Sequence, residues 1–175
     1  MATKIPKPII AISSCLLGKN VRYDGTNKRN ELILNKLPDY FELRAECPEM
    51  AIGLGVPRAP IQMVMLSNEL RLLGVDAPER DVTVAMQAHA KDMITLCADI
   101  SGYIFKSRSP SCGLEQVPVL NSRGELVQYS DGFYAGMIRS AYPQLPIIDE
   151  QALGSTDKVD EFIDRVQTYH QSKHN

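Results

Sequence analysis

The chain has 175 residues, of which 44% are hydrophobic, and this is enough to form the core of one domain of ordinary size. Its 19 basic and 21 acidic residues leave a formal net charge of −2, which argues against nucleic acid as a partner, although a local basic groove stays compatible with that charge. No apolar run reaches the roughly 18 residues of a membrane span, and the first residues lack the apolar stretch of a secretory signal, so we expect a cytoplasmic protein.

Short apolar segments alternate with helical patterns, which predicts an α/β fold on a mainly parallel sheet. The first predicted strand covers residues 8–14 and is apolar throughout, as expected for a strand covered on both faces. A loop rich in Gly and Asn follows, and then a helix at about 28–37, which Pro38 ends. The second strand covers about 40–46, and the long loop after it has at most one helical turn.

The second half of the chain continues the alternation. Residues 63–83 predict a hairpin that turns at Ser67–Asn68–Glu69. The later elements are a long helix at about 81–100, a strand at 102–107, a hairpin around 121–124, a helix ending near 142, a strand at 145–150 and a helix from 156. Ser130 or Asp131 is the expected N-cap of the helix that ends near 142. We therefore predict a single domain over 1–175, with helices on both faces of the sheet and a small hairpin excursion.

Three of the four cysteines follow predicted core strands. Cys15, Cys47 and Cys112 each lie within a few residues of the end of such a strand. In a reducing compartment cysteines are more often metal ligands, catalytic groups or buried residues than disulfides. Because the carboxyl ends of parallel strands share one edge of a sheet, where ligands bind, we expect these three to converge.

The fourth cysteine, Cys97, lies in a different pattern. It continues an apolar stripe at helical spacing with Val82, Met86, Ala90 and Met93. A free buried cysteine behaves as a small hydrophobic residue, so we expect Cys97 to be part of the core rather than a ligand.

Three converging thiolates suit two kinds of metal site. The chain has only 3 histidines, so a zinc site would need all three thiolates and a carboxylate or water. Thiolates also bind iron–sulfur clusters. A four-iron cluster on three cysteines leaves one iron free to bind a substrate atom as a Lewis acid. Three unrelated core cysteines are the remaining alternative.

Polar residues beside these cysteines are candidates for chemistry. Glu49 lies two positions after Cys47 and is a candidate general acid or base. The alternative is a glutamate in the first turn of a helix, which the helix dipole favours. Ser109 and Ser111 flank Pro110 just before Cys112 and either orient a polar heterocycle or an anion, or cap an ordinary turn.

The loop after Cys15 and the segment after Glu49 carry further candidates. Arg22 and Tyr23, with Asp24 beside them, suit contact with a substrate ring or phosphate, although a solvated loop is the first expectation for each of the three. Arg58 either points into the same cavity or forms a surface salt bridge.

Three separated motifs together resemble a known bacterial family, the thiouracil desulfidases. They are CLLGKNVRYDG from Cys15, CPEMAIGLGVPRAP from Cys47 and KSRSPSCG, which contains Cys112. The resemblance covers roughly 8–150 and leaves out the C-terminal helix. One departure is Thr26, which stands where the family pattern suggests a second glycine, and it affects the expected shape of the first loop.

The resemblance implies a Rossmann-like α/β domain that binds a [4Fe–4S] cluster through three cysteines. The site residues that it implies are Cys15, Cys47 and Cys112 as cluster ligands, Glu49 as the catalytic glutamate, and Ser109 and Ser111 as active-site serines. We assign catalysis to Glu49 and Ser109, and substrate binding to Ser111 and the first-loop residues Arg22, Tyr23 and Asp24.

The implied reaction is the hydrolytic removal of sulfur from a thiolated uracil. The free iron binds the thiocarbonyl sulfur as a Lewis acid, water adds at the ring carbon, and no net electron transfer is needed. Family members that act on thiolated RNA carry a further domain, for which this chain has no room, so we expect a small thiolated pyrimidine base or nucleoside. The rival hypotheses are a non-enzymatic iron–sulfur sensor or sulfide carrier and a zinc-binding domain. The sequence does not determine the oligomeric state.

Overall fold

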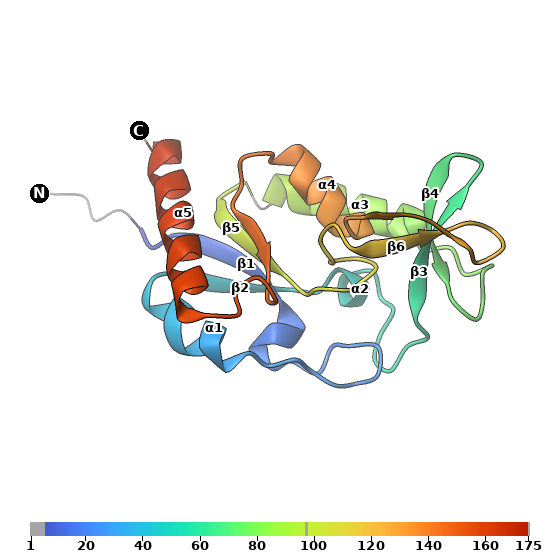
Figure 1. The fold of residues 1–175 in the computed structure, drawn as a ribbon, viewed down its shortest axis with the longest axis horizontal. Helices are drawn as coiled ribbons and strands as arrows, with labels where there is room; N and C mark the ends of the chain where they lie inside the picture. The colour runs from blue at the N-terminus through green and yellow to red at the C-terminus, as the bar shows by residue number, and fades with distance from the viewer. Residues whose placement is uncertain (1–5, 97, 175) are drawn as a thin grey trace, which may run out of the picture.

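The structure is a computed structural model that describes residues 6–96 and 98–174, and it contains two four-stranded sheets (Figure 1). Sheet A is parallel throughout and has the order β2-β1-β5-β8. Its strands are β1 (Ile9–Ser13), β2 (Glu42–Glu46), β5 (Ile100–Phe105) and β8 (Ile147–Asp149). The predicted α/β fold with a mainly parallel sheet is confirmed.

The two predicted hairpins join to form sheet B, which the sequence did not predict as a separate sheet. Its order is β4-β3-β6-β7, and it contains β3 (Ile61–Leu66), β4 (Glu69–Gly74), β6 (Val117–Leu120) and β7 (Leu126–Ser130). Each hairpin is antiparallel, while β3 and β6 pair in parallel through Met63 with Val119 and Val64 with Leu120.

The helices cover both faces of sheet A. They are α1 (Glu31–Lys36), α2 (Pro48–Ala51), α3 (Thr83–Leu96), α4 (Phe133–Ala141) and α5 (Thr156–His174), with two 3₁₀ helices, η1 (Ser14–Leu17) and η2 (Leu37–Asp39). One core cluster joins Ile10 and Ile104 of the sheet to α1 and α5. The other joins Tyr103 and Phe105 to α3, α4 and sheet B.

Gly102 in β5 lets α5 approach sheet A closely. A Cβ atom at this position would lie 2.8 Å from Cγ2 of Val166 and 3.2 Å from Cγ2 of Ile10. A larger residue would therefore push α5 away from the strand. The amphipathic pattern predicted for this helix is present, since Val159, Phe162 and Val166 are fully buried.

Three predicted helix boundaries were wrong. The helix expected from about residue 28 begins at Glu31, because Asn30 is its N-cap. The long helix ends at Leu96 rather than near residue 100, because Ile100 already begins β5, whose residues are all buried. The N-cap of α4 is Gly132, and no side chain caps this helix. The Ser130 hydroxyl donates to the carbonyl of Asp131, and the Asp131 carboxylate accepts from the backbone N–H of residue 115.

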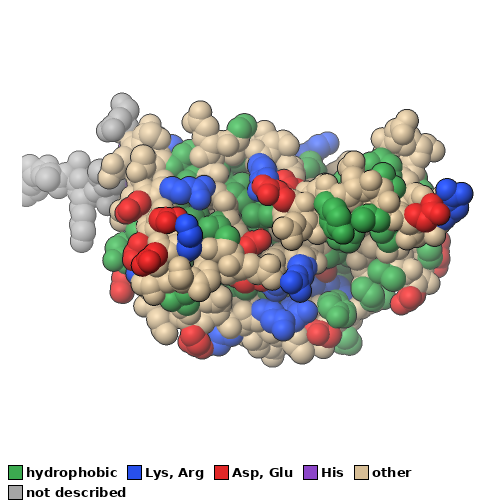
Figure 2. All heavy atoms as spheres, viewed as in Figure 1, with side chains coloured by type: hydrophobic (Ala, Val, Ile, Leu, Met, Phe, Trp, Pro, Cys, Tyr) green, Lys and Arg blue, Asp and Glu red, His purple; other side chains and the backbone are tan. Residues whose placement is uncertain are grey.

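The apolar stripe of the long helix is confirmed for four of its members, since Val82, Met86, Ala90 and Met93 are buried. Its fifth member, Cys97, lies outside the described residues. Within 6–96 and 98–174, no helix is long and apolar enough to cross a membrane. Acidic and basic side chains are interspersed over the face in Figure 2, and several Lys and Arg side chains gather near its middle.

Candidate active site

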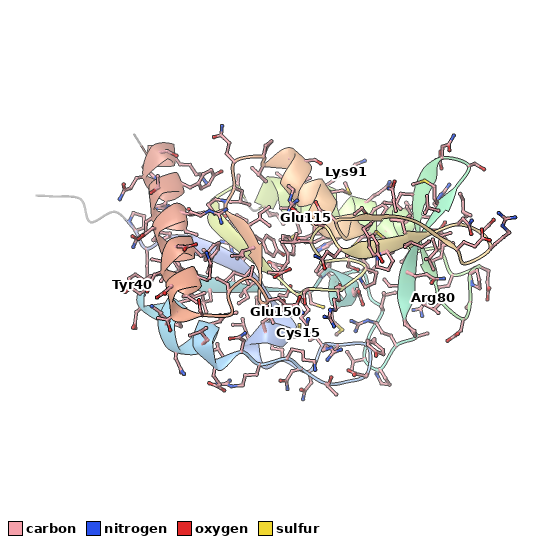
Figure 3. All side chains as sticks on the ribbon, in the orientation of Figure 1. Cys15, Tyr40, Arg80, Lys91, Glu115 and Glu150 are labelled. Carbon is pink, nitrogen blue, oxygen red and sulfur yellow. The ribbon has the colours of Figure 1, made fainter. Side chains whose placement is uncertain are left out.

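The structure brings Cys15, Cys47 and Cys112 to one edge of sheet A, where all three line a cavity of about 500 Å³. Cys15 lies in η1 directly after β1, Cys47 follows β2 as the N-cap of α2, and Cys112 lies in the loop after β5. The volume is within the range of small-molecule sites. In Figure 3, Cys15 lies beside Glu150 at the ends of the sheet A strands.

The loop that contains Cys112 is held against the first turn of α4. The carbonyls of Pro110, Ser111 and Gly113 accept hydrogen bonds of 2.7–3.0 Å from backbone N–H groups at the start of this helix. Gly132 makes this contact possible, because a Cβ atom there would lie 2.6 Å from the carbonyl carbon of Ser111. The position of Cys112 is therefore fixed by α4 as well as by β5.

The Cys15 and Cys47 backbones are fixed by local hydrogen bonds. The Cys15 carbonyl accepts from the N–H of Gly18 at 3.2 Å and from that of Lys28 at 2.9 Å, which closes the first loop onto η1. Cys47 has an extended backbone, and its carbonyl accepts from the N–H of Ala51 within the single turn that Pro48 begins. The predicted turn of helix at this position is confirmed.

Burial governs the ionisation of all three thiols. It raises the pKa of Cys15 to about 11, raises that of Cys47, and raises that of Cys112 well above its ordinary value. A thiol must lose its proton to bind a metal, so metal binding at this site would release protons.

Glu49 is fixed on both of its carboxylate oxygens. Oε1 accepts from Oγ of Ser111 at 2.8 Å, and Oε2 pairs with Nε of Arg58 at 2.8 Å. The Arg58 side chain is only 5% exposed and that of Glu49 13%, and Arg58 also donates to the carbonyl of Gly55. Of the two alternatives for Arg58, the cavity position is correct, and its salt bridge is buried rather than on the surface.

The two predicted serines have different positions. Ser109 lines the cavity, and its Oγ accepts from the N–H groups of Ser111 and Cys112 at 3.2 and 3.0 Å. Its hydroxyl proton stays available for a ligand, since a hydroxyl has one donor and two acceptor positions. Ser111 is fully buried behind Glu49 and is not one of the described residues that line the cavity. Its hydroxyl faces Glu49, which differs from the substrate contact that we expected.

The three predicted first-loop residues also differ in position. Arg22 and Tyr23 line the cavity, with the guanidinium 5.9 Å from the centre of the Tyr23 ring. Asp24 is exposed and accepts hydrogen bonds from the hydroxyl and N–H of Thr26, which hold its pKa below the ordinary value. Thr26, the departure from the family pattern, thus closes the turn, and Asp24 is a turn residue that does not line the cavity.

Sequence reasoning missed a second ion pair at the cavity. Nζ of Lys106 lies 2.5 Å from Oε1 of Glu150, and Ser107 donates to Glu150 from both its N–H and its hydroxyl at 2.7 Å. Lys106 lies in the KSRSPSCG motif, but Glu150 follows β8, and only the pairing of β8 with β5 brings the two together. In the described part of the chain, no three His, Cys, Asp or Glu side chains are placed to hold a single metal ion.

A parallel α/β sheet with three thiols and a fixed carboxylate around one cavity defines a candidate metal-dependent enzyme site. The family model for 2-thiouracil desulfurase matches residues 10–150. The chain therefore belongs to the 2-thiouracil desulfurase family, as the sequence motifs predicted, and this is a family of enzymes.

Two further comparisons agree with this assignment. The uncharacterized protein YbbK of Bacillus subtilis (strain 168) is 35% identical over 111 residues, which span 60% of this chain and 73% of that protein. A solved structure of the [4Fe-4S]-dependent thiouracil desulfidase TudS matches with a TM-score of 0.63 and 28% identity, and covers 85% of this chain and 94% of its own.

Proposed function

We propose that this protein removes sulfur hydrolytically from a thiolated uracil-type base or nucleoside, at a [4Fe–4S] cluster bound by Cys15, Cys47 and Cys112. The observation that carries the proposal is the single cavity that these three thiols share with Glu49. Support comes from the family match and from the similarity to a [4Fe-4S]-dependent thiouracil desulfidase.

The donor set fits such a cluster. Three thiols from three different loops face one cavity, and thiolate sulfur is the usual protein ligand of iron–sulfur clusters. When bound, a cluster with three protein ligands supplies an open iron that polarises a thiocarbonyl group as a Lewis acid. The reaction balances as thiocarbonyl plus water giving carbonyl plus hydrogen sulfide, so no electron donor is required.

Glu49 acts as the general base and acid in this proposal. Its carboxylate lines the cavity two residues after a cluster ligand, and the hydrogen bonds from Ser111 and Arg58 hold it in place. It takes a proton from the attacking water and returns one to the ring or to the leaving sulfur. Ser111 and Arg58 are positioning residues, since they act through the carboxylate.

The remaining cavity residues are suited to hold the ring. The Ser109 hydroxyl, whose oxygen accepts two backbone hydrogen bonds, donates its proton to a polar ring atom. Tyr23 presents an aromatic face at 45% exposure, with Arg22 beside it, and these two suit the open end of the site, where a base stacks or a sugar leaves the cavity.

The test is anaerobic reconstitution with iron and sulfide, followed by incubation with 2- and 4-thiouracil and their nucleosides. We expect several equivalents of sulfide per chain and an equal amount of the carbonyl product. A fully assembled cluster that releases no sulfide from any of these compounds would exclude the activity and favour a sensor or carrier. Metal analysis with one zinc and no iron would favour the zinc-binding alternative.

A further inference from the structure

The side chain of Lys106 is a charged part of the cavity wall that the function proposed above does not use. Besides its 2.5 Å contact with Glu150, its Nζ donates to the carbonyl and the hydroxyl of Ser107, both at 3.0 Å. The Lys106 side chain is 19% exposed and that of Glu150 is 14% exposed. Three partners on a half-buried side chain hold the ammonium group in one place.

Of this ion pair, the lysine lines the cavity. Lys106 and Ser107 belong to the described residues that line the cavity, whereas Glu150 does not. Burial acts to raise the pKa of Glu150, but hydrogen bonds from Lys106 and Ser107 outweigh it and hold that pKa below its usual value. The carboxylate is therefore ionised at neutral pH and anchors the lysine in the cavity wall.

Lys106 and Cys15 line the same cavity. Cys15 lies just after β1 and Lys106 just after β5, and these two strands pair in parallel, so their ends lie side by side. The backbone N–H of Lys106 also donates to Oγ of Ser13, at 2.9 Å, and the Ser13 hydroxyl interacts with the Cys112 thiol. Lys106 thus shares the cavity with Cys15 and is linked to Cys112 through Ser13.

Negative charge is what a cluster would bring to this cavity. A [4Fe–4S]²⁺ core on three thiolates has a net charge of about −1, and reduction adds a further negative charge. In a partly dehydrated cavity this charge is costly unless a fixed cation lies nearby. Glu49 and its partner Arg58 are already engaged with each other on the Cys47 side.

We propose that Lys106 is the fixed counter-charge of the cluster on its Cys15 side, with Glu150 and Ser107 as positioning residues that hold it. This inference rests on the cluster of the proposed function. Because net charge near an iron–sulfur cluster sets its reduction potential, the consequence is measurable without any substrate.

The experiment compares midpoint potentials of anaerobically reconstituted protein by a redox titration monitored by electron paramagnetic resonance. Lys106→Met keeps the length of the side chain and removes its charge, so we expect a more negative midpoint potential at unchanged iron content. Lys106→Arg keeps the charge and is expected to stay closer to the wild type. Lys91→Met, on α3 away from the cavity (Figure 3), removes the same charge and should not shift the potential.

An unchanged potential in Lys106→Met, or an equal shift in Lys91→Met, overturns the inference. If Lys106→Met does not take up a cluster, Lys106→Gln is measured instead, and loss of the same positive charge should again make the potential more negative. A potential that is unchanged or more positive in Lys106→Gln contradicts the counter-charge. Wild-type protein that forms no cluster contradicts the proposed function, whereas a cluster indifferent to Lys106 contradicts this inference alone.

Discussion

Two largely buried ion pairs flank the cavity, and they differ in the partner that we propose to act in the site, the carboxylate in one pair and the ammonium group in the other. On the Cys47 side, the Glu49 carboxylate is fixed by Arg58 and by Ser111, one partner for each oxygen. On the Cys15 side, Lys106 lines the cavity, and its partner Glu150 is not among the described residues that do. The same kind of contact thus positions the carboxylate that we propose as the acid–base group at one side and the proposed counter-charge at the other.

The two ion pairs also differ in how the chain brings their partners together. Glu49 comes from the turn after β2, within one local motif, so its partner Arg58 is only nine residues away. Lys106 and Glu150 are 44 residues apart, and each directly follows one of two paired strands, β5 and β8. The first arrangement can be found in the sequence, whereas the second exists only once the parallel sheet has formed.

The largest effect is expected from loss of a thiol, because this removes the cluster that both ion pairs are proposed to serve. Cys15→Ala, Cys47→Ala and Cys112→Ala should each abolish the brown chromophore after reconstitution, because a cluster with only two protein ligands is poorly held. Visible absorption and iron analysis check this. Cys97→Ala should keep the chromophore, and its equal loss there would show that the ligand assignment is wrong.

Glu49→Gln should lower the rate of sulfide release by about 100-fold or more, because general acid–base catalysis contributes on this scale. The amide is similar in size to the carboxylate, so the cluster spectrum should be retained. The measurement is the initial rate at saturating thiouracil. Unchanged turnover would remove Glu49 from the mechanism.

Arg58→Met should destabilise the apoprotein by about 3 kcal/mol, because it leaves the buried Glu49 carboxylate without its partner. Urea unfolding followed by circular dichroism gives this value. Arg71→Met is the matched control, since Arg71 pairs with Glu69 and Asp81 at a more exposed position. Arg71→Met should lower the free energy of unfolding by less than about 1 kcal/mol. Equal losses would mean that the Glu49–Arg58 pair contributes no more than an exterior one.

The smallest effect is expected for Asp24→Asn. Asp24 is exposed, and its hydrogen bonds to described residues all go to Thr26 within the same turn. Stability should therefore change by about 0.5 kcal/mol or less, and sulfide release should stay near the wild-type rate. A large fall in the rate at low substrate concentration would restore Asp24 to the substrate-binding role that the sequence suggested.

The sequence predicted the parts of the fold and site that depend on local pattern. The apolar strand before Cys15, the single helical turn at Pro48 and both hairpins follow from hydrophobic runs and turn residues. The convergence of the three cysteines followed from one general property of parallel sheets.

The parts that were missed depend on contacts between distant segments. The pairing of β3 with β6, which makes one sheet of two hairpins, involves few residues and no distinctive pattern. Gly132 replaced the expected side-chain cap of α4 because the Cys112 loop packs against it. The motif around Ser111 predicts a substrate contact. The fold shows instead that its hydroxyl binds Glu49, which lies between Ser111 and the cavity.

The most direct test of the central claim is the absorption spectrum and the iron and acid-labile sulfide content of anaerobically prepared protein. The proposed site predicts a brown protein with broad visible absorption, and about four irons and four sulfides per chain. Protein that carries zinc in place of iron, or that takes up no cluster under conditions in which its three thiols are reduced, would contradict it.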